Sequence, residues 1–276
     1  MTSLDAGTAA ALTLDAVARG AATACLLQVS EGKGAGRRLL LVVEAGGQSR
    51  LYGSLGGGEA EGAALKRARE ALLDTGHPDG GLVSLDDGTE LYLEIRRPVL
   101  DLVIVGAGHI ARPMARTGAD LGYRVWVLDD RPDFATRERF PDAHQVLRAD
   151  FSDPFREVPI HAGTHILLVT RGHKYDYDCL VRVLRGDPLP AYIGMIGSRR
   201  RVRATFVQLL EDGIPRDRLG GIHAPVGLDI GAETPEEIAV AVAAELVKVR
   251  RGGTGASLRD LENVAERFFP QSEETV

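Results

Sequence analysis

The stretch LDLVIVGAGHIA, residues 100–111, decides the fold. Its apolar run predicts a buried strand, and the glycines that follow have the spacing Gly106-x-Gly108-x-x-Ala111. In such a turn Gly106 permits the tight bend, Gly108 lets a phosphate approach the backbone, and Ala111 lets the next helix pack closely. A helix is expected over residues 109–122, broken late at Gly118. The motif therefore predicts a dinucleotide-binding type of fold, although such a scaffold also holds other ligands.

The next apolar run, RVWVLDD at residues 124–130, predicts a second strand that ends in Asp129 and Asp130. These acids follow the glycine turn by about twenty residues, where a carboxylate can accept hydrogen bonds from ribose hydroxyls. Both are therefore candidate cofactor contacts, as is His109 inside the turn.

Strand and helix patterns continue to alternate downstream. Apolar runs occupy residues 144–150, 164–170, 191–197 and 220–225, and helices are expected around 177–184, 199–210 and 235–249. This alternation predicts a mostly parallel, doubly wound sheet. Thr234 and Pro235, followed by Glu237, form a typical helix start.

The residues before this region predict a smaller α+β domain. Strands are expected over residues 24–30, 37–45 and 90–97, with a helix over 59–76 that Gly76 ends. The predicted fold class is thus α/β, a Rossmann-like doubly wound parallel sheet preceded by a smaller α+β domain. The expected boundaries are 1–97 for the first domain, 98–250 for the Rossmann-like domain, and 251–276 for a linker with a C-terminal helix and tail.

Composition excludes several classes of protein. The net charge of −6 disfavours broad nucleic-acid binding. The only cysteines, Cys25 and Cys179, exclude a disulfide framework and a cysteine-ligated zinc site, and they suit a reducing compartment. No signal peptide and no membrane-spanning run is recognisable, so a cytoplasmic location without membrane partners is expected.

Three polar segments are further candidate sites. Residues 170–178, TRGHKYDYD, follow an expected strand and contain His173, Lys174 and Asp178, which can position a ligand or move a proton. Residues 223–237 hold Asp229 between two glycine turns, and residues 53–62 form a glycine-rich turn before a helix. The alternative for each segment is a structural loop that binds no ligand. In residues 53–62, the helix that follows already has acidic side chains in its first turn, and these complement its dipole.

The stretch GSRRRVR, residues 197–203, sets arginines at the start of an expected helix with Ser198 as the N-cap. Cations there cost roughly 0.3–1 kcal/mol against the helix dipole. They either point outward, where they pair with acids such as Asp129, Asp130 or Glu237 or with solvent, or they surround a bound anion. In the second case Gly197, Ser198, Arg199 and Arg200 would contact a phosphate, and Arg203 would face solvent or a partner.

The chain resembles the XdhC/CoxI family of xanthine dehydrogenase accessory proteins. The matching blocks are GSLGGGEAEGA at 53–63, LVIVGAGHIARPMA at 102–115, DDR at 129–131, YIGMIGSRRR at 192–201 and APVGLDIGAETPEEIAVAVAAE at 224–245. The resemblance implies a maturation factor that binds molybdenum cofactor, either molybdopterin or its dinucleotide form. It also implies assistance in the sulfuration of that cofactor with a cysteine desulfurase, and delivery to the apoenzyme of a xanthine dehydrogenase-like molybdenum hydroxylase.

The sequence departs from the family pattern in two places. Residues 30–40 read SEGKGAGRRLL where the family has a Gly-Ser-x-Pro-Arg segment, and Glu59 stands where the family has a cysteine. A carboxylate cannot carry sulfur as a thiolate can, so Glu59 argues against sulfur chemistry at that position.

The alternative function is an NAD(P)-dependent oxidoreductase that uses Gly106, Gly108 and Asp129. No obvious catalytic acid and base accompany them, which favours an accessory protein over a stand-alone enzyme, and a homodimer is left open. The complete set of candidate cofactor contacts is Gly106, Gly108, His109, Asp129, Asp130, His173, Gly197, Ser198, Arg199, Arg200 and Asp229, with no metal ligand among them.

Overall fold

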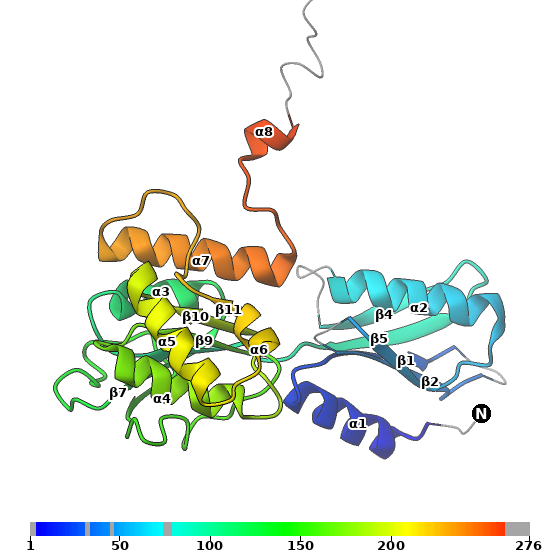
Figure 1. Ribbon diagram of the computed structural model, residues 1–276. Helices are drawn as coiled ribbons and strands as arrows, with labels where there is room; N and C mark the ends of the chain where they lie inside the picture. Colours follow the sequence, from blue (N-terminus) through cyan, green and yellow to red (C-terminus); the bar gives the residue numbers. More distant parts are fainter. Residues whose placement is uncertain (1–3, 31–33, 45–46, 74–78, 263–276) are drawn as a thin grey trace, which may run out of the picture.

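Two separate sheets, each covered by helices, make up the protein (Figure 1). The computed structural model describes residues 4–30, 34–44, 47–73 and 79–262. One sheet is antiparallel and lies in the first part of the chain, and the other is parallel and follows it. The predicted fold class, α/β with a Rossmann-like parallel sheet after a smaller α+β unit, is therefore confirmed.

The antiparallel sheet has the strand order β3-β2-β1-β5-β4. Its strands are β1 (Ala22–Gln28), β2 (Arg38–Val43), β3 (Ser49–Gly53), β4 (Gly80–Ser84) and β5 (Glu90–Arg96). Helix α2 (Gly58–Leu73) covers one face through its alanines, and α1 (Ala6–Ala18) packs on β1 and β2 from the other side. The small alanine side chains let α2 approach the leucines of the sheet closely.

Helix α1 and strands β3 and β4 were not predicted from the sequence. Strand β3 is mostly exposed and β4 begins with two glycines, so neither shows the apolar alternation that marks a strand. Both are edge strands, which bury little and therefore carry a weak sequence signal. The predicted cap at Gly76 lies outside the described residues.

The parallel sheet has the order β11-β10-β9-β6-β7-β8. Its strands are β6 (Asp101–Val105), β7 (Arg124–Asp129), β8 (Gln145–Arg148), β9 (Thr164–Leu168), β10 (Tyr192–Met195) and β11 (Ile222–His223). Counted along the chain from β6, this is the 3-2-1-4-5-6 order of dinucleotide-binding folds. The order reverses between β6 and β9, so the ligand crevice of such a sheet lies beyond the carboxyl ends of these two strands.

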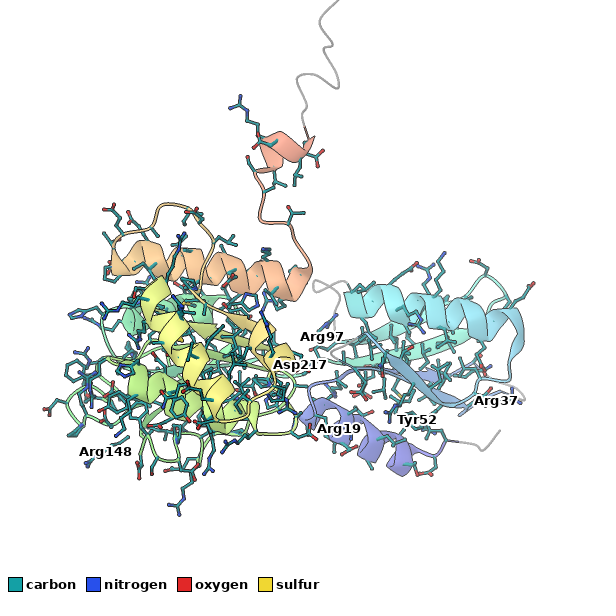
Figure 2. The ribbon with its side chains drawn as sticks, in the orientation of Figure 1. Arg19, Arg37, Tyr52, Arg97, Arg148 and Asp217 are labelled. Atoms are coloured by element: carbon teal, nitrogen blue, oxygen red, sulfur yellow. The ribbon has the colours of Figure 1, made fainter. Side chains whose placement is uncertain are left out.

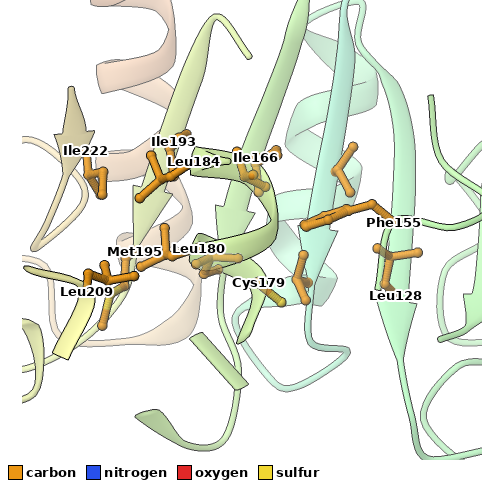
Figure 3. Packing of buried hydrophobic residues seen from close by; sticks show 14 of the residues in the cluster. Leu128, Phe155, Ile166, Cys179, Leu180, Leu184, Ile193, Met195, Leu209 and Ile222 are labelled. Carbon is orange, nitrogen blue, oxygen red and sulfur yellow. The ribbon is translucent and has the colours of Figure 1, made fainter. Parts of the chain in front are cut away.

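Helices cover both faces of the parallel sheet. Helices α3 (Ala111–Asp120) and α7 (Pro235–Arg251) share one hydrophobic cluster with β6 and β7. Helices α4 (His173–Leu184), α5 (Arg199–Glu211) and α6 (Arg216–Gly220) contribute to the cluster on the other face, which includes Cys179, Leu180 and Met195 (Figure 3). Each core is built from the near-continuous apolar strands that a sheet buried on both faces requires.

The expectation that Gly118 breaks the helix after the glycine turn was wrong. Helix α3 continues through Gly118 to Asp120. A Cβ at position 118 would lie only 2.6 Å from Leu102 Cδ2, so the glycine permits α3 to pack closely against β6. Helix α7 continues to Arg251, one residue beyond the expected limit of this domain, and a short helix, α8 (Leu258–Glu262), follows.

No helix within the described ranges is both long and apolar enough to span a bilayer.

Candidate functional site

The glycine turn after β6 uses its two glycines for different purposes. Gly106 has a φ of 107°, and a Cβ there would lie 2.6 Å from the Val169 carbonyl oxygen. Any side chain at this position would therefore clash with backbone and strain the turn. Gly108, in contrast, has open space where a Cβ would be, with no atom within 4 Å. The backbone at Gly108 is therefore open to an approaching ligand.

Asp129, at the end of β7, is bound to the turn and to Arg131. Its Oδ2 accepts the Ala107 N–H at 2.7 Å, and its Oδ1 accepts the Arg131 N–H at 3.0 Å. The Arg131 guanidinium donates to both oxygens at 2.8 Å. Burial by itself would raise the pKa of Asp129, but these hydrogen bonds outweigh it and lower the pKa to about 2. A ribose hydroxyl would have to displace one of these donors.

Two arginines that stack on the same aromatic ring also hold the glycine turn in place. The Arg131 guanidinium lies 3.5 Å from the Phe134 ring centroid, and that of Arg139 lies 4.8 Å from it. Arg139 Nη2 also donates to the Ala107 carbonyl at 3.2 Å. The peptide groups on both sides of Ala107 are thus held, one N–H by Asp129 and one carbonyl by Arg139. Sequence reasoning missed Phe134 and Arg139, because only spatial proximity links them to the turn.

Asp130 binds the loop that follows β9. Arg171 donates two hydrogen bonds to its carboxylate, at 2.6 and 2.7 Å, and a third to the Tyr175 hydroxyl at 2.6 Å. The same guanidinium lies over the Tyr175 ring. This pair connects the carboxyl ends of β7 and β9 across β6. Asp130 therefore pairs with Arg171 and not with the arginines of residues 199–203, for which it was one of the acids considered.

The arginine run has one member with a structural role, Arg201. Its Nε donates to Asp176 Oδ2 at 2.7 Å, and its Nη2 donates to Asp176 and, at 3.0 Å, to Thr170 Oγ1. Asp176 is fully buried, and burial raises its pKa although Thr170 and Arg201 both donate to it. Ser198 is the N-cap as predicted, accepting the Arg201 N–H at 3.3 Å. The acid that pairs with the arginine run is thus Asp176, whereas Glu237 caps α7.

The other three arginines of the run remain accessible. Arg199, Arg200 and Arg203 are exposed, and their guanidinium groups make no hydrogen bond or ion pair with the residues that the structure describes. Together with Ala204 and Val207 they line an open hollow of about 650 Å³. These three arginines are thus exposed to solvent, as the first of the two alternatives expects, and no residue of the described fold pairs with their charges near the start of α5.

Cations gather at three helix starts on the same edge of the sheet. Helices α3, α4 and α5 follow β6, β9 and β10, which are consecutive neighbours in the sheet. Their starts carry a set of basic residues that we call the cationic rim: His109, Arg112, His173, Lys174, Arg199 and Arg200. Neither α3 nor α5 has an acid in its first turn. Because two strand spacings are about 10 Å, the rim can face a single ligand.

The remaining candidate residues differ in their surroundings. His173 and Asp229 are exposed, the first at the start of α4 and the second in the loop between β11 and α7. Gly197 lies against the Arg201 side chain, 3.2 Å from Cδ to the position of a Cβ. Glu245 holds the loop after β11, since its Oε2 accepts the Gly227 N–H at 2.9 Å and the Tyr192 hydroxyl at 2.7 Å. Sequence reasoning missed this acid.

The glycine-rich turn of the antiparallel domain is filled by its own carboxylate. Glu61 Oε2 accepts hydrogen bonds from Ser54 Oγ at 2.6 Å, from Leu55 N at 2.7 Å and from Gly57 N at 3.0 Å. Arg37 donates to the Leu55 carbonyl and lies on the same domain (Figure 2). The geometry therefore supports the alternative in which this turn is a structural loop and does not bind an anion.

Neither cysteine has the surroundings of a reactive thiol. Burial raises the pKa of Cys25, as does the neighbouring Glu94, and burial also raises the pKa of Cys179. Both thiols therefore stay protonated at neutral pH. Glu59 is exposed at the start of α2. Among the described residues, no group of three histidine, cysteine, aspartate or glutamate side chains is arranged to hold a metal ion.

Comparison with known families places these features in context. Residues 102–246, more than half of the chain, match the family model described as the XdhC Rossmann domain. The uncharacterized protein YqeB of Escherichia coli (strain K12) is 29% identical over 233 residues, which are 78% of this chain and 41% of that protein. A protein of Bacillus subtilis (strain 168) named as a probable xanthine dehydrogenase subunit is 34% identical over 171 residues, which are 62% of this chain and 49% of that protein. The chain thus spans less than half of the length of either relative.

The fold is also similar to that of a solved structure. A xanthine dehydrogenase from Bacillus halodurans superposes with a TM-score of 0.57 and 23% identity, covering 91% of this chain and 67% of that one. At this identity the likeness concerns the fold alone.

Proposed function

The chain belongs to the XdhC family, and on that premise we propose that it is an accessory protein for a xanthine dehydrogenase-type molybdenum hydroxylase. In this role it binds molybdenum cofactor and passes it to the apoenzyme. The name of the Bacillus subtilis relative, which links that protein to xanthine dehydrogenase, supports the association with such an enzyme.

The observation that carries the proposal is the cationic rim beside the open glycine turn. Three helix starts present basic side chains to one edge of a protein whose net charge is −6. Helix N-termini already favour anions, and unpaired guanidinium groups strengthen that preference. Molybdopterin carries a phosphate, and its dinucleotide form carries a diphosphate. The residues present therefore fit the anionic part of either form.

Specific groups can hold that phosphate. The open backbone at Gly108 and the Ser198 hydroxyl supply hydrogen-bond partners, and the Arg199 and Arg200 guanidinium groups supply charge. When bound, the cofactor supplies the molybdenum on which the client enzyme depends. This chain's own contribution is to bind and orient it.

Sulfuration, in this proposal, depends on a partner. Both thiols of the chain are protonated, and Glu59 replaces the family cysteine, so no residue of this chain is suited to carry sulfur. A cysteine desulfurase would deliver sulfur directly to the cofactor while the chain holds it.

Equilibrium dialysis against molybdopterin tests the proposal. We expect the Arg199→Ala/Arg200→Ala variant to bind at least tenfold more weakly than the wild-type protein, with a shallower salt dependence. Arg203→Ala is the control on the same helix: it removes one guanidinium group one turn further on, whereas the double variant removes two. Equal affinity in the wild type and the double variant would refute the assignment of the site. Tight NADH binding without molybdopterin binding would replace the proposal by the oxidoreductase alternative.

A further inference from the structure

A basic cleft adjoins the cationic rim, with which it shares His109 and Arg112, and lies between the start of α3, the loop before β8 and the start of α7. It is open to solvent and has a volume of about 460 Å³. Its polar lining consists of His109, Arg112, Arg116, Arg139, Asp142 and Glu236, and three prolines complete its walls. The volume lies within the range of small-molecule sites.

The charges in this cleft are not balanced by the fold. Arg112 and Arg116 stand one turn apart on α3, and neither guanidinium has an ion pair with any part of the chain that the structure describes. Like charges at this spacing destabilise a helix by about 0.2–0.5 kcal/mol, and Arg112 also opposes the helix dipole. Asp142 and Glu236 line the same cleft, yet neither forms an ion pair with these arginines.

Arg139 connects the cleft to the glycine turn. It lines the cleft, donates to the Ala107 carbonyl and stacks on Phe134, so its guanidinium is held in place. Its buried Nε has no hydrogen-bond partner among the described residues. A guanidinium that is already ordered loses little freedom when it meets an anion, so the cleft is prepared for one.

We propose that this cleft binds the phosphate group of a nucleotide, with Arg112 and Arg116 as its principal contacts. Arginine forks match phosphate geometry, and guanidinium planes can also stack on a base. The proline walls and the volume of the cleft fit a small ligand better than an extended acidic peptide. The inference goes beyond the proposed function because it assigns a nucleotide phosphate to Arg112 and Arg116, although His109 and Arg112 also belong to the cationic rim.

Isothermal titration tests the inference with CMP, GMP and AMP as ligands. Inorganic phosphate, cytidine and a deca-glutamate peptide are the comparison ligands. We expect the nucleotides to bind the wild-type protein and to bind Arg112→Ala/Arg116→Ala at least tenfold more weakly. Arg112→Lys/Arg116→Lys should be intermediate, because it retains charge without the fork. Lys66→Ala/Arg67→Ala, an equal loss of charge on α2, should bind as the wild type does.

Each other outcome overturns the inference. Equal nucleotide affinity in the double alanine variant would place the nucleotide elsewhere, as would the absence of any binding to the wild type. Phosphate binding as tightly as nucleotide would leave only an anion site, and binding of the peptide alone would indicate a protein-docking surface. Arg112 and Arg116 are exposed, so we expect the double alanine variant to fold, and circular dichroism checks that it does. If the double variant unfolds, Arg116→Gln takes its place in the titration. The Arg199→Ala/Arg200→Ala variant should retain nucleotide affinity, which separates this inference from the proposed function.

Discussion

Arg201 reaches from the first turn of α5 to the buried carboxylate of Asp176, with 2.7 Å between Nε and Oδ2. This pair joins α5 to α4 and, through Thr170, to the end of β9. It divides the arginine run into one residue that holds the fold together and three that remain free for ligands or partners. Of the four arginines, only Arg201 thus forms an ion pair that compensates for its unfavourable interaction with the helix dipole.

Arg201→Ala should destabilise the protein strongly. Removing the partner of the buried Asp176 carboxylate leaves that charge uncompensated, and we expect a loss of about 3–5 kcal/mol in the free energy of unfolding. Arg203→Ala, on the exposed side of the same helix, should change it by less than about 0.5 kcal/mol. Urea denaturation followed by circular dichroism measures both. Similar losses in the two variants would show that the Arg201 pair is not significant for stability.

The two glycines of the turn should respond differently to substitution. Gly106→Ala places a Cβ against the Val169 carbonyl at a positive φ, so we expect a protein of clearly reduced thermal stability. Gly108→Val meets open space, so the protein should stay folded while the valine obstructs the approach of a phosphate. Melting temperatures and molybdopterin dialysis distinguish the effects. Wild-type affinity in folded Gly108→Val would remove this turn from the site.

Asp129→Ala should weaken molybdopterin and its dinucleotide form to the same extent. Asp129 acts through the turn, because its oxygens accept the Ala107 N–H and the Arg131 guanidinium rather than facing a ligand. Asp129→Asn retains an acceptor for the Ala107 N–H and should recover part of the loss. A selective loss of the dinucleotide form would instead indicate that Asp129 contacts the ribose, with Arg131 displaced.

Stability should fall as the pH drops from about 6.5 to about 4, because of His165. Burial lowers the pKa of His165 from 6.5 to about 4. Between these values the unfolded chain binds a proton that the native protein does not, so acidification favours unfolding. The shift corresponds to about 3 kcal/mol at most.

Urea denaturation of the wild type and His165→Phe at pH 7 and at pH 5 measures this dependence. Phenylalanine can occupy the space between Tyr123 and Tyr192, where the histidine ring lies. The variant should lose less stability on acidification than the wild type. An equal loss in both proteins would assign the pH dependence to other groups.

The sequence by itself determined the parallel sheet and its glycine turn. Apolar runs, glycine spacing and helix caps are local patterns, and each one constrains the backbone within a few residues. The fold class, the Ser198 cap and the position of the turn after β6 could therefore be predicted. Helix α1 and edge strands β3 and β4 could not, because they bury little and their residues alternate weakly.

Only the tertiary structure decided which side chains of the site are free and which are bound to one another. Asp129 and Asp130 were predicted as ligand contacts, yet Arg131 and Arg171 occupy their carboxylates. Among consecutive arginines of the same chemistry, Arg201 is partly buried and paired with Asp176, while Arg199 and Arg200 are exposed. Residues far apart in the chain meet through the order of the strands and the rotation of each helix. A charge becomes a structural group or a binding group through that pairing in space, which no local pattern in the sequence encodes.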